Sequence, residues 1–119
     1  MKELTKAEEQ IMQVIWKLKE CLIKEIVEDL PEPKPAYNTV GTFLKILETK
    51  GFVQRKKLGN VFIYSPSVAK RDYGKKNITN LLSKYFNGSS ENLLSFMVEE
   101  KELSIDQVER LLKKLKKDD

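Results

Sequence analysis

Histidine is absent from this sequence of 119 residues, and cysteine occurs once, at Cys21. The chain therefore cannot build a Cys-His or Ser-His-Asp nucleophile system or a typical zinc site, and a single cysteine excludes an internal disulfide. Paired carboxylates do occur, at Glu8 with Glu9 and at Glu99 with Glu100. Because acidic side chains are seldom buried, we expect both pairs to lie on solvated helix faces. The sequence predicts neither an enzyme nor a cofactor or metal site.

Long apolar runs are also missing. No stretch approaches the roughly 18 residues that a membrane span requires, and the N-terminal sequence MKELTKAEEQ lacks the apolar segment of a signal peptide. Charged residues make up 34% of the chain, with both signs mixed along it, which is typical of soluble helical proteins. We therefore expect a cytoplasmic protein without membrane insertion.

Positive charge is concentrated in the middle of the chain. Residues 1–33 contain 5 lysines and 8 acidic residues, residues 34–66 contain 6 basic residues and 1 acidic residue, and residues 67–119 contain 11 basic and 9 acidic residues. A basic patch of this kind suits a polyanion, because neutralising phosphates releases their counterions. The middle segment is thus the candidate contact with nucleic acid.

The first 35 residues predict two helices and a break. Thr5 and Glu8 have the spacing of a capping box, which begins a helix, and apolar residues recur at helical spacing up to Leu18. A shorter helix is expected over residues 23–30, after a connection at Cys21 that could be extended. The three prolines of PEPKP then prevent further helix.

A third helix and a hairpin follow. The helix is expected to start near Asn38 or Thr39, both suitable N-cap residues, and to end at Gly51. Its apolar side contains Val40, Leu44 and Leu47, with Phe43 at the border. Residues 52–57 and 61–65 predict two strands joined by a tight turn at Gly59-Asn60. That turn pairs Arg55 with Tyr64 and Lys57 with Phe62.

Three helices followed by a hairpin predict a mainly α (α+β) fold, a winged helix-turn-helix, with a DNA-binding domain over residues 1–66. The third helix would enter the major groove, while the wing would place Lys56 and Lys57 against the phosphate backbone. The alternative is that this polar face and basic hairpin are only solvated. The candidate DNA-binding residues are Tyr37, Asn38, Thr39, Thr42, Lys45, Thr49, Arg55, Lys56, Lys57 and Asn60.

Residues 67–119 predict a helical dimerisation region. We expect a long helix broken or weakened at Gly74 and stopped at Asn87-Gly88, a compact apolar segment, and a last amphipathic helix that begins with a capping box of Ser104 and Gln107. Such helices bury little alone, so a homodimer is expected; the alternative is that they fold back on the winged helix. The candidate interface residues are Ile78, Leu81, Leu82, Tyr85, Phe86, Leu94, Met97, Val108, Leu111, Leu112 and Leu115.

Several segments in this order resemble the BlaI/MecI/CopY penicillinase repressor family over nearly the whole chain. IMQVIWKL, which includes Trp16, resembles the family's first helix, and NTVGTFLKILETKGFV is similar to its recognition helix. GNVFIYSP resembles its wing and strand, and KYFNGS and LLSFMVEEKELS resemble its dimer region.

The resemblance implies a cytoplasmic dimeric repressor that binds a dyad operator in double-stranded DNA. It also implies derepression by proteolysis: in the antibiotic-resistance members of the family, a membrane-bound sensor protease triggers cleavage of an Asn-Phe bond in the C-terminal region. The matching bond here is Ser95–Phe96, with serine in place of the asparagine.

Two further positions and one missing motif depart from the family pattern. Ile46 stands where the family usually has arginine, and Asn60 stands where its wing often has arginine, which removes a phosphate contact. The cysteine cluster of the copper-responsive branch is absent, so copper sensing is not expected.

Outside the repressor interpretation, a winged helix could also serve as a protein–protein adaptor whose hairpin binds an acidic partner, or as a ligand-responsive regulator.

Overall fold

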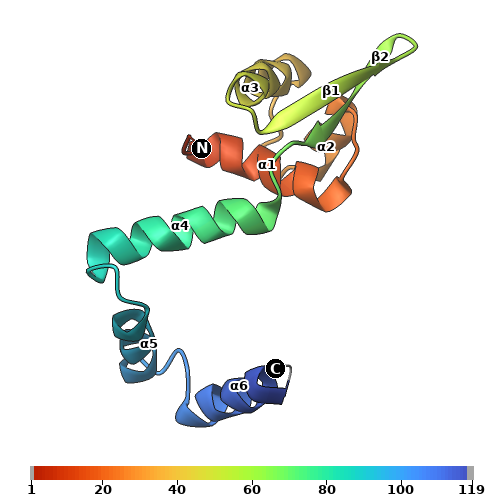
Figure 1. Ribbon diagram of the computed structural model, residues 1–119. Helices are drawn as coiled ribbons and strands as arrows, with labels where there is room; N and C mark the ends of the chain where they lie inside the picture. Colours follow the sequence, from red (N-terminus) through yellow and green to blue (C-terminus); the bar gives the residue numbers. More distant parts are fainter. Residues whose placement is uncertain (1, 118–119) are drawn as a thin grey trace. The chain divides into compact units, whose positions relative to one another are not determined.

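The computed structural model describes residues 2–117, which form six helices and one two-stranded sheet (Figure 1). The chain divides into two compact units between Tyr73 and Gly74. In chain order the elements are α1 (Lys6–Leu18), α2 (Ile23–Asp29), α3 (Tyr37–Thr49), β1 (Val53–Leu58), β2 (Val61–Pro66), α4 (Lys70–Tyr85), α5 (Ser90–Glu99) and α6 (Ile105–Lys117).

The predicted capping box begins α1. The Thr5 backbone N–H donates to Glu8 Oε1 at 2.8 Å, and the Glu8 N–H donates to Thr5 Oγ1 at 3.2 Å. One face of α1 then buries Ile11, Val14 and Ile15. Both the capping box and the apolar face are confirmed.

The predicted start of α3 is wrong by one or two residues. The helix begins at Tyr37, with Ala36 in extended conformation before it, and the Ala36 carbonyl already accepts a hydrogen bond from the Val40 N–H at 3.2 Å. No side chain caps this end. The apolar stripe is as predicted, because Val40, Leu44 and Leu47 have no exposed surface. Gly51 follows the helix with φ +85°, which confirms the predicted stop.

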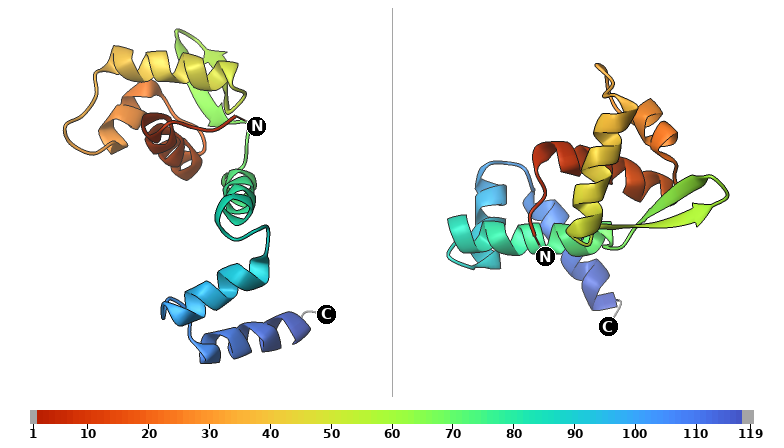
Figure 2. Two further views of the ribbon diagram at one scale, coloured as in Figure 1. Left: turned by 90° about the vertical axis from the view of Figure 1, so that its left-hand side faces the viewer. Right: turned by 90° about the horizontal axis from the view of Figure 1, so that it is seen from above.

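The hairpin of β1 and β2 projects from the helices that precede it (Figures 1 and 2). Its register pairs Arg55 with Tyr64 and Lys57 with Phe62, as predicted. The connection at Cys21, for which an extended conformation was one possibility, is extended. Cys21 and Tyr64 exchange two backbone hydrogen bonds, of 3.0 and 2.8 Å, which attach the hairpin to the link between α1 and α2.

The core of the first unit extends past the hairpin into the first turn of α4. Tyr73 is 5% exposed and packs edge-on against Phe52, with ring centroids 5.5 Å apart, and its hydroxyl accepts from the Leu4 N–H at 3.0 Å. The Trp16 indole N–H donates to the Val68 carbonyl at 2.8 Å. Residues 67–73 therefore belong structurally to the first unit, whereas the predicted division fell after residue 66.

The second unit contains the rest of α4 together with α5 and α6. Of the two alternatives at Gly74, the break is wrong: helix α4 continues through this residue, because one glycine costs only about 1 kcal/mol within a helix. Asn87 and Gly88 end it with φ values of 52° and 73°, as predicted. The capping box of Ser104 and Gln107 is confirmed by hydrogen bonds of 2.7 and 3.1 Å. The compact apolar segment is helical, as α5.

None of the side chains from residue 74 to residue 117 is buried. No helix over residues 2–117 is long and apolar enough to cross a membrane.

Glu8 corrects the expectation that the paired carboxylates are solvated. Its side chain is buried, and both carboxylate oxygens accept from Lys50 Nζ, at 2.6 and 3.1 Å. Burial opposes ionisation, but the hydrogen bonds from Lys50 and Thr5 outweigh it and hold the pKa of Glu8 below its ordinary value of 4.5. Glu8, the capping-box partner of Thr5 in the first turn of α1, thus anchors the residue that follows α3.

We expect Glu8→Gln to lower the free energy of unfolding by about 3 kcal/mol at pH 7, because it keeps the capping oxygen but leaves the Lys50 ammonium unpaired. The folded-state pKa lies below 4.5. The ion pair therefore contributes fully above that pH, and its contribution is lost as the pH falls through the folded pKa.

Urea unfolding between pH 7 and pH 3 measures this effect. Glu9→Gln, on the same turn and without an ion pair among the described residues, is the control. A stability difference between Glu8→Gln and the unmodified protein that stays constant down to pH 3 would contradict the assignment.

Candidate nucleic-acid interface

The outward face of α3 is the first part of the candidate interface. The candidate residues Asn38, Thr39, Thr42, Lys45 and Thr49 are all exposed, since the buried stripe occupies the opposite side of the helix. The Thr42 hydroxyl donates to the Asn38 carbonyl at 3.1 Å, so its proton is engaged within the helix. The Thr42 side chain can therefore offer its oxygen as a hydrogen-bond acceptor and its methyl group as an apolar contact. Base edges in the major groove present partners for both.

A surface hollow lies between the N-terminal end of α3 and the tip of the hairpin. Tyr37, 58% exposed, shares a surface hollow with Asn60 and Phe62. These positions are far apart in the sequence, and the structure brings them together because the hairpin is held beside α2 through Cys21 and Tyr64. Tyr37 and Asn60 thus line one hollow together with residues at the start of α2.

The pleat of the hairpin divides the predicted basic cluster. Successive residues of a strand point to opposite faces, so Arg55 and Lys57 share one face and Lys56 lies on the other. Lys56 borders a hollow that also contains Glu20 and Ile63. Lys56 and Lys57 were expected to act together on one phosphate backbone, but they project from opposite faces of the strand.

Arg55 is held by two neighbours. Its Nε donates to Glu48 Oε2 of α3 at 3.2 Å, and its guanidinium lies 4.4 Å from the centroid of the Phe62 ring. This contact joins the wing to α3. The role of Glu48 was missed from the sequence, where it was only the single acid of a basic segment, because the pairing depends on how β1 is oriented against α3.

Two more cations of the middle segment are engaged inside the fold. Lys34 Nζ donates to the carbonyls of Val27, Glu28 and Leu30 at 3.3, 2.7 and 2.8 Å, which caps the end of α2. Lys50 is paired with Glu8. Of the six basic residues at 34–66, only Lys45, Lys56 and Lys57 make no ion pair or side-chain hydrogen bond among the described residues.

Cys21 lies beneath the hairpin and is 2% exposed, with its Sγ 3.8 Å from the Tyr64 carbonyl oxygen. Burial, aided by the charge of Glu25, raises the pKa of the thiol to about 11. Cys21 is therefore an inert packing residue at neutral pH. Within residues 2–117, no three His, Cys, Asp or Glu side chains gather to form a metal site.

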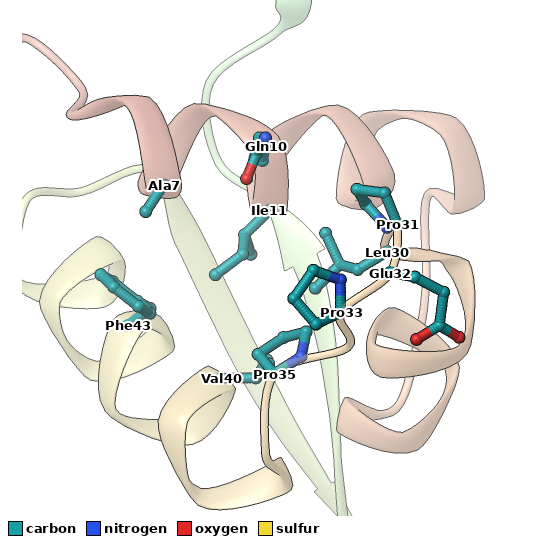
Figure 3. A pocket seen from close by; sticks show the side chains of 10 residues that line it. All are labelled: Ala7, Gln10, Ile11, Leu30, Pro31, Glu32, Pro33, Pro35, Val40 and Phe43. Atoms are coloured by element: carbon teal, nitrogen blue, oxygen red, sulfur yellow. The ribbon is translucent and has the colours of Figure 1, made fainter.

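An apolar hollow of about 260 Å³ lies between α1, the proline segment and α3 (Figure 3). Ile11, Leu30 and Phe43 contribute to its walls, with Gln10 and Glu32 as the polar members. It borders α3 on the Phe43 side rather than on the polar face. Its volume is below the range of about 300–1,000 Å³ that is usual for small-molecule sites.

The candidate dimer residues in α4, α5 and α6 are solvent-accessible in the single chain. Leu82, Phe86, Met97 and Val108 are half-buried. The remaining seven are exposed: Ile78, Leu81, Tyr85, Leu94, Leu111, Leu112 and Leu115. Within the unit, the rings of Phe86 and Phe96 pack with centroids 5.6 Å apart. The Ser95–Phe96 bond lies inside α5, and both residues are exposed.

Comparison with known proteins gives the same family over nearly the whole chain. Residues 4–117 match the family described as Penicillinase repressor. The methicillin resistance regulatory protein MecI of Staphylococcus aureus (strain N315) is 32% identical over 110 residues, which cover 92% of this chain and 89% of that protein. The penicillinase repressor of Bacillus licheniformis is 27% identical over 110 residues, with coverage of 92% and 86%.

Solved structures match the first unit. The DNA-binding domain of the repressor BlaI in solution has a TM-score of 0.52 and 32% identity, covering 61% of this chain and 94% of that one. The monomeric form of Bacillus licheniformis BlaI in complex with the blaP half-operator has a TM-score of 0.51 and 32% identity, covering 60% and 89%. These likenesses confirm the winged-helix fold of the N-terminal unit.

Proposed function

The chain belongs to the penicillinase repressor family, which consists of transcriptional repressors rather than enzymes, and we propose that two copies of it bind a dyad DNA operator and repress transcription. The observation that carries this proposal is the outward face of α3, where exposed polar side chains stand opposite a fully buried apolar stripe. A relative of 32% identity, BlaI, has been solved in complex with a half-operator, which supports operator DNA as the ligand here.

In the proposed complex α3 enters the major groove. Thr42 and Lys45 face base edges, Thr42 as an acceptor and Lys45 as a donor. Lys57 contacts a phosphate from the α3 side of the wing, while Arg55 remains beside Glu48 and supports the geometry. The wing therefore positions the protein, and α3 determines which sequence it prefers.

The dimer is proposed to form through the second unit. Its helices expose apolar side chains that a single chain does not bury, among them Leu111, Leu112 and Leu115 at 49–55% exposure. Burying such residues contributes about 1.5–3 kcal/mol each. Two joined copies would present two α3 helices to half-sites roughly 34–36 Å apart.

Repression is proposed to end by a cut at Ser95–Phe96, made after a membrane-bound sensor protease responds to a signal. Both residues are exposed, which supports access. Because the bond lies in α5, this helix would have to unwind locally before cleavage. The cut would detach α6 and its apolar stripe, and separate monomers would lose the advantage of binding two linked half-sites.

Thr42→Ala should relax the base preference of the protein at one position in each half-site, with a loss of about 1–3 kcal/mol for the preferred base and little change on random DNA. Selection of binding sites from a random-sequence duplex library measures the preference. Thr79→Ala is a matched control, because Thr79 makes the same hydrogen bond to the carbonyl four residues earlier, at 3.0 Å, but in α4. An equal loss on specific and random DNA would contradict the groove assignment.

Leu112→Glu should convert the dimer into monomers and weaken operator binding, since it places a carboxylate in the apolar stripe. The first unit should remain folded, because its core is built from residues up to Tyr73. Sedimentation at tens of micromolar measures the assembly, with Lys113→Glu on the same helix as the control. A monomer for the unmodified protein would refute the dimer proposal.

Cleavage should leave an N-terminal fragment that ends at Ser95 in derepressed cells. Mass spectrometry of the protein from repressed and derepressed cells distinguishes this route from others. An intact chain under full derepression would exclude the cleavage switch and leave repression by the dimer unaffected.

A further inference from the structure

A group of lysine side chains outside the wing lies beside the outward face of α3, close to the C-terminal end of this helix. A surface hollow of about 300 Å³ is lined there by Lys2, Lys45, Ile46, Thr49 and Lys50. Four of these residues belong to α3 or follow it directly, but Lys2 comes from the segment that precedes α1. Three of the five side chains carry a positive charge, so the hollow suits an anion.

The segment that carries Lys2 is fastened to the core of the first unit. Lys50 Nζ, which is paired with Glu8, also donates to the Glu3 carbonyl at 3.3 Å. The Leu4 N–H donates to the Tyr73 hydroxyl at 3.0 Å, and the Leu4 side chain packs against the core. These contacts at the two residues that follow Lys2 explain why it lies next to α3.

The three lysines of the hollow are not equally free to bind an anion. Lys50 is neutralised by the Glu8 carboxylate at 2.6 Å. Lys2 and Lys45 are exposed and make no ion pair within residues 2–117. Ile46, 39% exposed, lines the same hollow and brings no charge of its own. Two unpaired ammonium groups thus border the face of α3 that is proposed to meet DNA.

We propose that Lys2 is a further DNA-contacting residue, which binds a backbone phosphate at the edge of the groove that α3 enters. This inference rests on the proposed function. Lys2 would extend the contact surface beyond α3 and the wing, and would supply positive charge beside position 46, where α3 has isoleucine. A phosphate contact of this kind fixes register and adds affinity on every sequence, without choosing among bases.

Lys2→Ala should weaken binding to a 30-base-pair duplex of random sequence about fivefold to tenfold at 0.1 M salt, and should reduce the slope of log affinity against log salt by about one. Operator binding should fall by the same factor. Lys6→Ala is the matched control, because Lys6 is an exposed lysine at the start of α1 that does not line the hollow. Fluorescence anisotropy from 50 to 200 mM salt provides both affinity and slope.

A second variant tests the place of the contact. Ile46→Arg in the Lys2→Ala background should restore the slope of log affinity against log salt to that of the unmodified protein. The guanidinium of the new arginine would reach the same hollow from α3. Equal slopes for Lys2→Ala and Lys6→Ala, or an arginine at position 46 that restores nothing, would overturn the inference. If the unmodified protein itself shows no salt-dependent DNA binding, the proposed function fails instead, so the two failures are distinguishable.

Discussion

The surface of the first unit depends on the burial of one apolar stripe in α3. Val40, Leu44 and Leu47 have no exposed surface, and burying each contributes about 1.5–3 kcal/mol. This burial fixes the rotation of α3 about its own axis, because a turn of 100°, the angle between successive residues, would bring polar side chains into the core. The same constraint that stabilises the unit therefore holds Thr42 and Lys45 in solvent, where they can meet a ligand.

The basic residues of the middle segment fall into two groups: some bind other parts of the fold, and the others remain available for a partner. Lys34 caps α2, Lys50 pairs with buried Glu8, and Arg55 joins the wing to Glu48. These cations hold the elements of the interface in place rather than facing a partner. The remaining charge is available for phosphates, and the N-terminal segment adds Lys2 to it. Fewer positive side chains are therefore available to DNA than the number of basic residues in the sequence implies. The engaged cations instead hold the elements of the interface in place.

The two units differ in how they are stabilised. The first buries a continuous core that includes Met12, Ile26 and Phe52. The second, over its described residues, buries no side chain, although α5 and α6 are well capped helices. Local capping can form such helices, but it cannot cover their apolar faces. That contrast is the physical basis for proposing a second copy as the cover, and for proposing that loss of α6 ends repression.

The sequence by itself determined the features that depend on neighbours a few residues apart. The capping boxes at Thr5 and Ser104, the apolar stripe of α3, the register across Gly59-Asn60 and the winged-helix order all follow from short spacings, because the required hydrogen bonds and helical periods are local. The polar face of α3 could be predicted for the same reason.

Only the tertiary structure decided which charges remain available and where the first unit ends. Glu8 meets Lys50 42 residues away, and Tyr73 meets Leu4 69 residues away. Glu48 meets Arg55 because of how β1 is oriented against α3, and Lys2 lines a hollow with Ile46 because Leu4 is held by Tyr73. A sequence records the type and order of these residues, but the partner of each one is set by how distant segments pack around the shared core.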